Sequence, residues 1–75
     1  KFVENFKEII EALRMANFNL NDASKLLHVH KNTLIYRLDK IREILNADPL
    51  GNNNDREFVN GFYHYLKRKE QIYQD

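Results

Sequence analysis

Residues that break helices are almost absent from this chain, which has two glycines and one proline in 75 residues. Near its start, apolar side chains recur three and four positions apart, at Phe2, Phe6, Ile9, Ile10, Leu13 and Ala16. That spacing gathers them on one face of a helix. Similar spacing continues through most of the chain, so we predict an all-α fold, a three- to four-helix bundle.

Four helices are predicted, over residues 2–16, 20–27, 31–46 and 55–73. Asn19 can cap the second helix, and Asn54 with Glu57 has the spacing of a capping box before the fourth. Pro49 requires the third helix to end before it, because the residue preceding a proline is displaced from helical geometry.

The third and fourth predicted helices also have apolar faces. In the third we expect burial of Leu34, Leu38, Ile41 and Leu45, with Ile35 and Ile44 widening the buried face. In the fourth, the predicted apolar side comprises Phe58, Val59, Phe62, Leu66 and Tyr73. This helix is rich in aromatic residues, which indicates either core packing or a surface for a partner. Gly61 marks either a close helix contact or a weak point in the helix.

Charge is unevenly distributed although the net charge is only +1. Residues 28–42 carry four basic and one acidic side chain, whereas residues 43–66 carry one basic and four acidic side chains. The chain has no cysteine, which excludes disulfides and thiolate metal sites. No apolar run approaches the roughly 20 residues of a membrane span. We therefore expect a cytoplasmic protein that does not contact the membrane.

A short turn joins the second and third predicted helices, since only His28, Val29 and His30 separate them. The helix before the turn contains the small residues Ala23 and Ser24, and the helix after it begins with polar residues. This order is typical of a helix-turn-helix motif. We expect Val29 to fill the corner between the helices and the polar side of the third helix to face outward.

That polar side suits a DNA duplex. Thr33, Arg37 and Lys40 follow at steps of four and three, so they project along one line of the helix, with Tyr36 beside them. The first turn of a helix also presents unpaired amides and the positive end of the helix dipole, which favour phosphate. The candidate DNA-binding residues are His30, Lys31, Asn32, Thr33, Tyr36, Arg37 and Lys40.

The side chains suggest individual roles on the duplex. Arg37 can bond a guanine edge with two hydrogen bonds and Asn32 an adenine edge, while Thr33 can contact a phosphate or a thymine methyl group. Lys31 and Lys40 would mainly set the register on the phosphate backbone.

Residues 17–41, NFNLNDASKLLHVHKNTLIYRLDKI, resemble the carboxy-terminal helix-turn-helix of PucR/CdaR-type bacterial transcription regulators, itself similar to the Fis-type DNA-binding fold. The resemblance rests mainly on the signature H-x-N-T-L-x-Y-R-L-x-x-I, which spans His30 to Ile41. It implies sequence-specific binding of double-stranded DNA by an output domain attached to an amino-terminal sensing region. Phe18 stands where such sequences often have glycine, and Ser24 where a second alanine is usual.

Because the chain opens on Lys1 rather than methionine, we expect residues 1–75 to be a single DNA-binding domain from the carboxyl end of a longer regulator. One small module makes few contacts, so we also expect a homodimer, formed through the parent protein or through the fourth helix.

The alternative is a helical protein–protein interaction or dimerisation module, which would use an apolar groove rather than a basic face. An enzyme is not expected, because Ser24 is the only serine and the sequence has no glycine-rich phosphate loop or paired-carboxylate motif. His28, His30 and His64 lack carboxylate or thiolate partners at supporting spacing, so we expect no metal and no cofactor.

Overall fold

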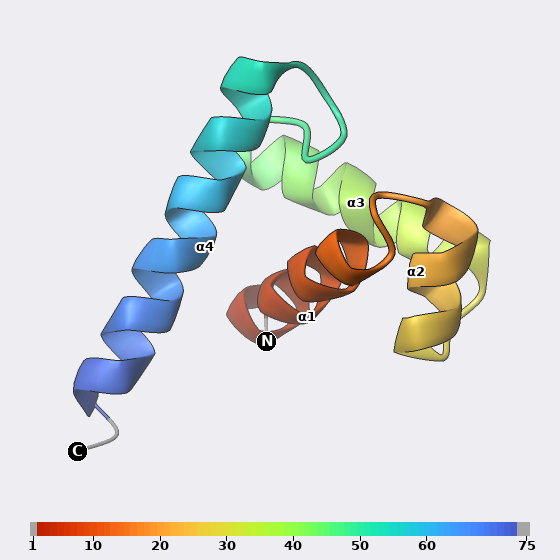
Figure 1. Cartoon of the computed structure of the whole chain (residues 1–75). Coiled ribbons are helices and arrows are strands. Elements are labelled where there is room, and N and C mark those ends of the chain that lie inside the picture. Colours follow the sequence, from red (N-terminus) through yellow and green to blue (C-terminus); the bar gives the residue numbers. More distant parts are fainter. Residues whose placement is uncertain (1, 74–75) are drawn as a thin grey trace.

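The computed structural model describes residues 2–73, with side chains for residues 2–69. It consists of the helices α1 (Phe2–Met15), α2 (Leu20–Leu27), α3 (Lys31–Leu45) and α4 (Asn53–Tyr73), as Figure 1 shows. The prediction of an all-α fold is confirmed, and each predicted helix is present with bounds within two residues of those expected. Among the described helices, none has the length and apolar character needed to span a membrane.

The core lies where α1, α2 and α3 meet, and α4 closes it from the side of α1 (Figure 1). Its most deeply buried large side chains are Phe6 and Leu13 from α1 and Leu34 and Ile41 from α3. The apolar face predicted for α1 is therefore confirmed at its centre. Phe2 and Ala16, at its two ends, are only partly buried.

The predicted buried face of α3 is too wide. Leu34, Leu38 and Ile41 are buried, whereas Ile44 remains 58% exposed and Ile35 36% exposed. Because α3 packs through a narrow stripe of side chains, its flanking isoleucines stay at the surface.

The predicted apolar face of α4 is confirmed at Val59, Phe62 and Leu66 but is wrong at Phe58. Phe58 is 54% exposed, whereas Tyr63, which the prediction left off this face, is only 6% exposed. Val59 is buried, Phe62 and Leu66 pack partly against the core, and the side chain of Tyr73 lies outside the described residues. Helical spacing alone is compatible with burial of either Phe58 or Tyr63. The contacts of α4 with α1 determine that Tyr63 is the buried residue.

Gly61 lies on the exposed side of α4, and a Cβ atom added there would have no neighbour within 4 Å. No close contact with another part of the described chain therefore requires glycine. We expect Gly61→Ala to stabilise the domain by about 1 kcal/mol, because alanine has the higher helix propensity. Urea denaturation followed by circular dichroism tests this, and a destabilised variant would contradict it.

An asparagine side chain caps the start of both α2 and α4. Asn19 Oδ1 accepts a hydrogen bond from the Asp22 amide at 2.9 Å, which confirms the predicted cap of α2. At α4 the predicted cap by Asn54 is wrong: Asn52 Oδ1 accepts from the Asp55 amide at 2.9 Å, so the helix begins two residues earlier than expected.

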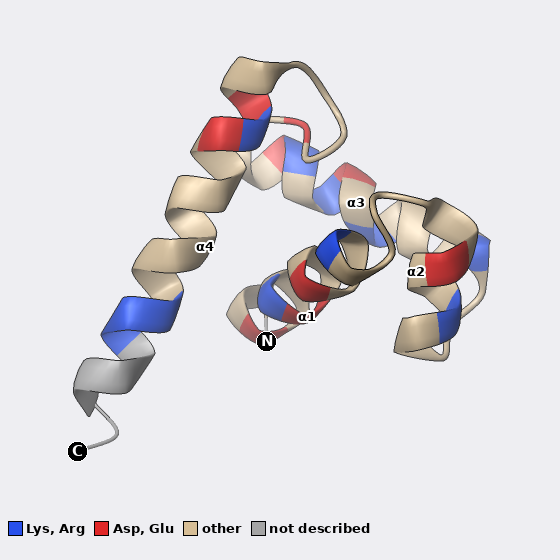
Figure 2. Cartoon of the chain, viewed as in Figure 1, with Lys and Arg blue, Asp and Glu red and all other residues tan. Residues whose placement is uncertain are grey.

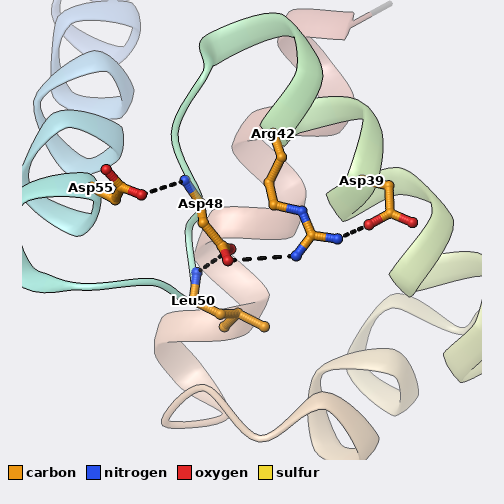
Figure 3. A network of polar contacts seen from close by, with 5 residues as sticks. All are labelled: Asp39, Arg42, Asp48, Leu50 and Asp55. Atoms are coloured by element: carbon orange, nitrogen blue, oxygen red, sulfur yellow. Dashed lines mark hydrogen bonds and ion pairs between the residues drawn. The ribbon is translucent and has the colours of Figure 1, made fainter.

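A polar network explains that shift and connects α3 to α4 (Figure 3). Arg42 pairs with Asp39 within α3 and reaches Asp48 in the loop at 3.5 Å. The Asp48 carboxylate accepts from the Leu50 amide at 2.9 Å, and the Asp48 amide donates to Asp55 Oδ2 at 3.2 Å. Starting α4 at Asn53 puts Asp55 in its first turn, where its carboxylate can hold the loop.

On the other side of the core, Tyr63 joins α4 to α1. Its hydroxyl donates to Glu11 Oε2 at 2.6 Å, and Lys67 Nζ lies 3.5 Å from the same oxygen. The hydrogen bond from Tyr63 lowers the pKa of Glu11, partial burial opposes that effect, and the charges of Lys67 and Lys7 reinforce it. Burial and the same hydrogen bond raise the pKa of Tyr63.

This pairing predicts a pH dependence of stability. The pKa of Glu11 in the folded state lies below its ordinary value of 4.5, so its contribution is present above that pH and is lost as the pH falls through the folded pKa. Since the side chain is 45% exposed, we expect an effect below about 1 kcal/mol. Thermal unfolding of the wild type and Glu11→Gln should differ at neutral pH and converge in acid. A difference that persists in acid would contradict this assignment.

The turn between α1 and α2 contains Phe18, whose backbone has φ 66°. This is the left-handed region, which residues other than glycine rarely adopt. This geometry accounts for the glycine that similar sequences often have at this position. The Phe18 ring lies under the Arg56 guanidinium, 4.7 Å from ring centroid to Cζ, and lines a small cavity with Ile10 and Val59. Packing against α4 offsets the unfavourable backbone conformation.

Candidate nucleic-acid interface

The turn between α2 and α3 is set by backbone hydrogen bonds. His28 adopts the left-handed conformation (φ 57°, ψ 40°), and its amide donates to the Lys25 carbonyl at 3.1 Å. The next amide, of Val29, donates to the Ser24 carbonyl at 3.1 Å, which completes a Schellman motif. The Val29 side chain packs against the core, as predicted for the corner between the helices.

The small residues of α2 allow the close packing that this turn requires. Ala23 is fully buried and Ser24 is 6% exposed. Ser24 Oγ donates to the Asn21 carbonyl at 2.8 Å, so its hydroxyl is satisfied within the helix at a position where alanine is usual. Serine in place of alanine at position 24 therefore leaves no unpaired polar group in the core.

The first turn of α3 is open to solvent. His30 precedes the helix in an extended conformation, and its side chain makes no capping hydrogen bond. The first helical bond runs from the Leu34 amide to the His30 carbonyl at 3.1 Å, while His30, Lys31 and Asn32 are exposed. Amides at the start of a helix have no carbonyl partner within it, so this end of α3 favours an anion.

The remaining predicted site residues, Thr33, Tyr36, Arg37 and Lys40, come together along α3. Tyr36 is 62% exposed, and Lys40 Nζ lies 5.5 Å from the centroid of its ring. Thr33 and Arg37 are partly buried. Together with the apolar side chains of Ile41 and Ile44, these four residues form one wall of a groove of about 480 Å³.

The opposite wall of this groove is formed by α1, through Phe2, Asn5, Phe6 and Ile9. Asn5 is exposed there, and sequence reasoning missed it as a candidate site residue. It lies 25 residues before His30, and no local pattern around it indicates that α1 borders the polar face of α3. Only the packing of the two helices brings it to the site.

The basic residues of α3, whose ribbon is blue in Figure 2, differ in their ion-pair partners. Arg42 is paired with Asp39 and Asp48. Among the side chains that the structure describes, Lys31, Arg37 and Lys40 have no acidic partner within 4 Å. The uncompensated positive charge therefore lies on the open first turn and along the groove, where a phosphate backbone can approach.

The three histidines that the sequence offers as metal ligands are all exposed. Over the described residues, no three histidine, aspartate or glutamate side chains are grouped closely enough to hold a metal ion.

Comparison with known proteins agrees with this geometry. Residues 6–57 match the PucR C-terminal helix-turn-helix domain, and these residues contain the α2–turn–α3 unit in full. The chain belongs to this family. The resemblance found in residues 17–41 is thereby confirmed, and the PucR match extends over most of α1 and into the start of α4.

One relative of this PucR-family chain is the DNA-binding transcriptional activator AdeR of Bacillus subtilis (strain 168), 48% identical over 44 residues. The alignment covers 59% of the present chain and only 10% of AdeR. No solved structure matches the chain.

Proposed function

We propose that this domain binds double-stranded DNA sequence-specifically, as the output module of a bacterial transcription regulator, with α3 in the major groove. The observation that carries the proposal is the positive charge of Lys31 on the open first turn of α3 and of Arg37 and Lys40 along the groove, none of which has an acidic partner among the described side chains. Membership of the PucR family and the similarity to AdeR, a DNA-binding transcriptional activator, support the same assignment. The parent regulator would act in the cytoplasm, where it meets the chromosome.

The proposed contacts divide into two kinds. Arg37 would bond a guanine edge and Asn32 an adenine edge, which reads sequence. His30 and the first-turn amides would hold a phosphate, with Lys31 and Lys40 on the backbone at either side. Thr33 and Tyr36 would complete the surface between them, and Asn5 on the opposite wall would lie close to the same strand.

We propose a regulatory role for the domain and no catalytic one, because it belongs to a family of DNA-binding regulatory domains. We further propose that it forms the carboxyl-terminal part of a larger regulator. Two copies would bind half-sites about one helical turn apart, brought together by the parent protein or by α4.

The salt dependence of binding tests the assignment. Titration with a mixed-sequence duplex should show affinity falling steeply as salt rises, and Lys31→Ala should reduce the slope by about one unit because one phosphate contact is lost. Lys7→Ala removes the same charge from α1, at a position beside Glu11 and Lys67 and outside the groove, and serves as the matched control. Binding insensitive to salt would instead indicate docking through apolar contacts.

A further inference from the structure

The groove between α1 and α3 has an apolar part that the proposed contacts with DNA do not use. Phe6, Ile9 and Ile41, each at most 2% exposed, line its inner part. Phe2 on α1 is only partly buried, and Ile44 on α3 is exposed. A DNA duplex presents chiefly phosphates, sugars and polar base edges, so this apolar surface has no partner in the proposed complex.

The groove has the size and composition of a small-molecule site. Its volume of about 480 Å³ lies within the range of roughly 300–1,000 Å³ that is typical of such sites. They combine an apolar lining with a few polar groups that fix the orientation of the ligand. Here the polar groups are Asn5 from α1 and Thr33, Arg37 and Lys40 from α3.

The charged groups of this groove are all positive. Arg37 and Lys40 belong to its lining, and none of the described residues that line it is acidic. Neither cation has an acidic partner within 4 Å among the described side chains. The three glutamates of α1 line a different pocket, together with Lys67. The groove therefore attracts an anionic group, and Arg37 can bind a carboxylate through two parallel hydrogen bonds.

Aromatic side chains border the groove on both sides. Phe2 and Phe6 come from α1, with ring centroids 5.9 Å apart, and Tyr36 comes from α3. Aromatic rings make favourable edge and offset contacts with a further ring. A flat, rigid ring system also loses less conformational entropy on binding than a flexible chain of the same size. The apolar part of the groove therefore favours an aromatic ligand.

We propose that the groove between α1 and α3 binds an aromatic carboxylate. Its ring system lies against Phe6 and Ile41, and its carboxylate pairs with Arg37 and Lys40. This binding does not require DNA. A bound ligand occupies two cations that α3 needs for the duplex, so it weakens DNA binding; that consequence rests on the proposed function.

The affinity for a small ligand is low. Tyr36, Lys40 and Ile44 are exposed, so the bound molecule keeps contact with solvent along one side. A two-ring carboxylate has few atoms with which to make contacts, and we expect a Kd on the order of 1 mM.

Titration of 2-naphthoate into the isotope-labelled 75-residue chain, followed by nuclear magnetic resonance, measures this binding. The amide signals of Asn5, Thr33 and Ile44 should shift and saturate, whereas that of Tyr65, on α4 and outside the groove, should not. Three other compounds separate the parts of the ligand. 2-Naphthalenemethanol has the same rings without the charge and should bind at least about fivefold more weakly. Decanoate, a flexible carboxylate of similar size, should also bind more weakly, and acetate should give no saturable shift.

Substitutions distinguish this site from the DNA contacts. Ile44→Ser removes apolar surface from the groove at a residue that is not among the proposed DNA contacts. It should weaken 2-naphthoate binding by about threefold and leave the affinity for DNA unchanged. Leu26→Ser changes an exposed apolar residue of α2 outside the groove, and as the matched control it should change neither.

Lysine variants give the complementary comparison. Lys31 does not line the groove, so Lys31→Ala should weaken DNA binding without affecting 2-naphthoate. Lys40→Ala should weaken both. In a direct competition, 2-naphthoate at several times its Kd should lower the affinity for a duplex, whereas the same concentration of 2-naphthalenemethanol should not.

The proposal is overturned if the groove signals do not saturate with 2-naphthoate, or if the alcohol or decanoate binds as tightly. Saturable binding that leaves the affinity for DNA unchanged would overturn its inhibitory effect. None of these results alters the salt-dependent binding of DNA expected for α3. Conversely, salt-insensitive DNA binding combined with saturable binding of 2-naphthoate would refute the proposed function and leave this site in place.

Discussion

Replacing Arg37 with alanine is expected to weaken binding to a preferred DNA site by about 1–3 kcal/mol and to relax base preference at one position of that site. Arg37 lies on the groove wall between Thr33 and Lys40, without an acidic partner among the described side chains. Its guanidinium is therefore available to a base edge. Selection of bound duplexes from a randomised pool, followed by measurement of affinity, gives both quantities.

Arg37→Lys is the matched control for this prediction. It keeps the positive charge but removes the planar pair of donors that recognises a guanine edge. Affinity for unrelated sequences should stay near that of the wild type, whereas preference at the affected position should fall. If an Arg37→Ala/Lys40→Ala variant bound DNA as well as the wild type, the assignment of this face would be wrong.

Phe6→Ala is expected to cost about 3–5 kcal/mol of unfolding free energy, the largest effect of any single change considered for stability. Phe6 is fully buried, and its ring centroid lies 5.3 Å from that of Phe62 and 5.9 Å from that of Phe2. It therefore connects α1 to α4 and also lines the groove. The free energy of unfolding of a domain of this size is only a few kcal/mol, about the size of this loss, so we expect much of the variant to be unfolded at room temperature.

Urea titrations followed by helical circular dichroism measure this change. Phe6→Leu should cost less than Phe6→Ala, because more of the buried volume is kept. Met15→Ala, at a side chain that is 77% exposed, should stay within about 0.5 kcal/mol of the wild type. A Phe6→Ala variant as stable as Met15→Ala would mean that Phe6 does not hold the core together.

The comparison of α3 with α4 shows where prediction from the sequence succeeds and where it fails. In α3, Leu34, Leu38 and Ile41 are buried as their spacing predicts. In α4 the same reasoning predicted that Phe58 is buried. The spacing of the apolar residues fits a helix equally well whether the buried face contains Phe58 or Tyr63. Tyr63 is buried because its ring packs beneath Arg14 while its hydroxyl reaches Glu11. Glu11 lies 52 residues away, and no local pattern connects the two residues.

The candidate site was also predicted only in part from the sequence. The motif from His30 to Lys40 predicted one face of one helix, and the structure places Thr33, Tyr36, Arg37 and Lys40 along one groove and leaves the residues before them exposed. Sequence reasoning did not find Asn5 on the opposite wall. Charge counting also treated Arg42 as part of the basic excess, whereas Asp39 and Asp48 pair with it. Among the described side chains, Lys31, Arg37 and Lys40 have no acidic partner.

The sequence by itself determined four helices, the cap at Asn19, the corner residue Val29 and the polar start of α3. Each of these depends on interactions within a few residues along the chain, which local rules describe. Only the tertiary structure decided which aromatic stripe of α4 is buried, which arginine is neutralised and which residues of α1 border the groove. Those outcomes depend on contacts between helices, and the order of residues within one helix does not specify the helix that packs beside it.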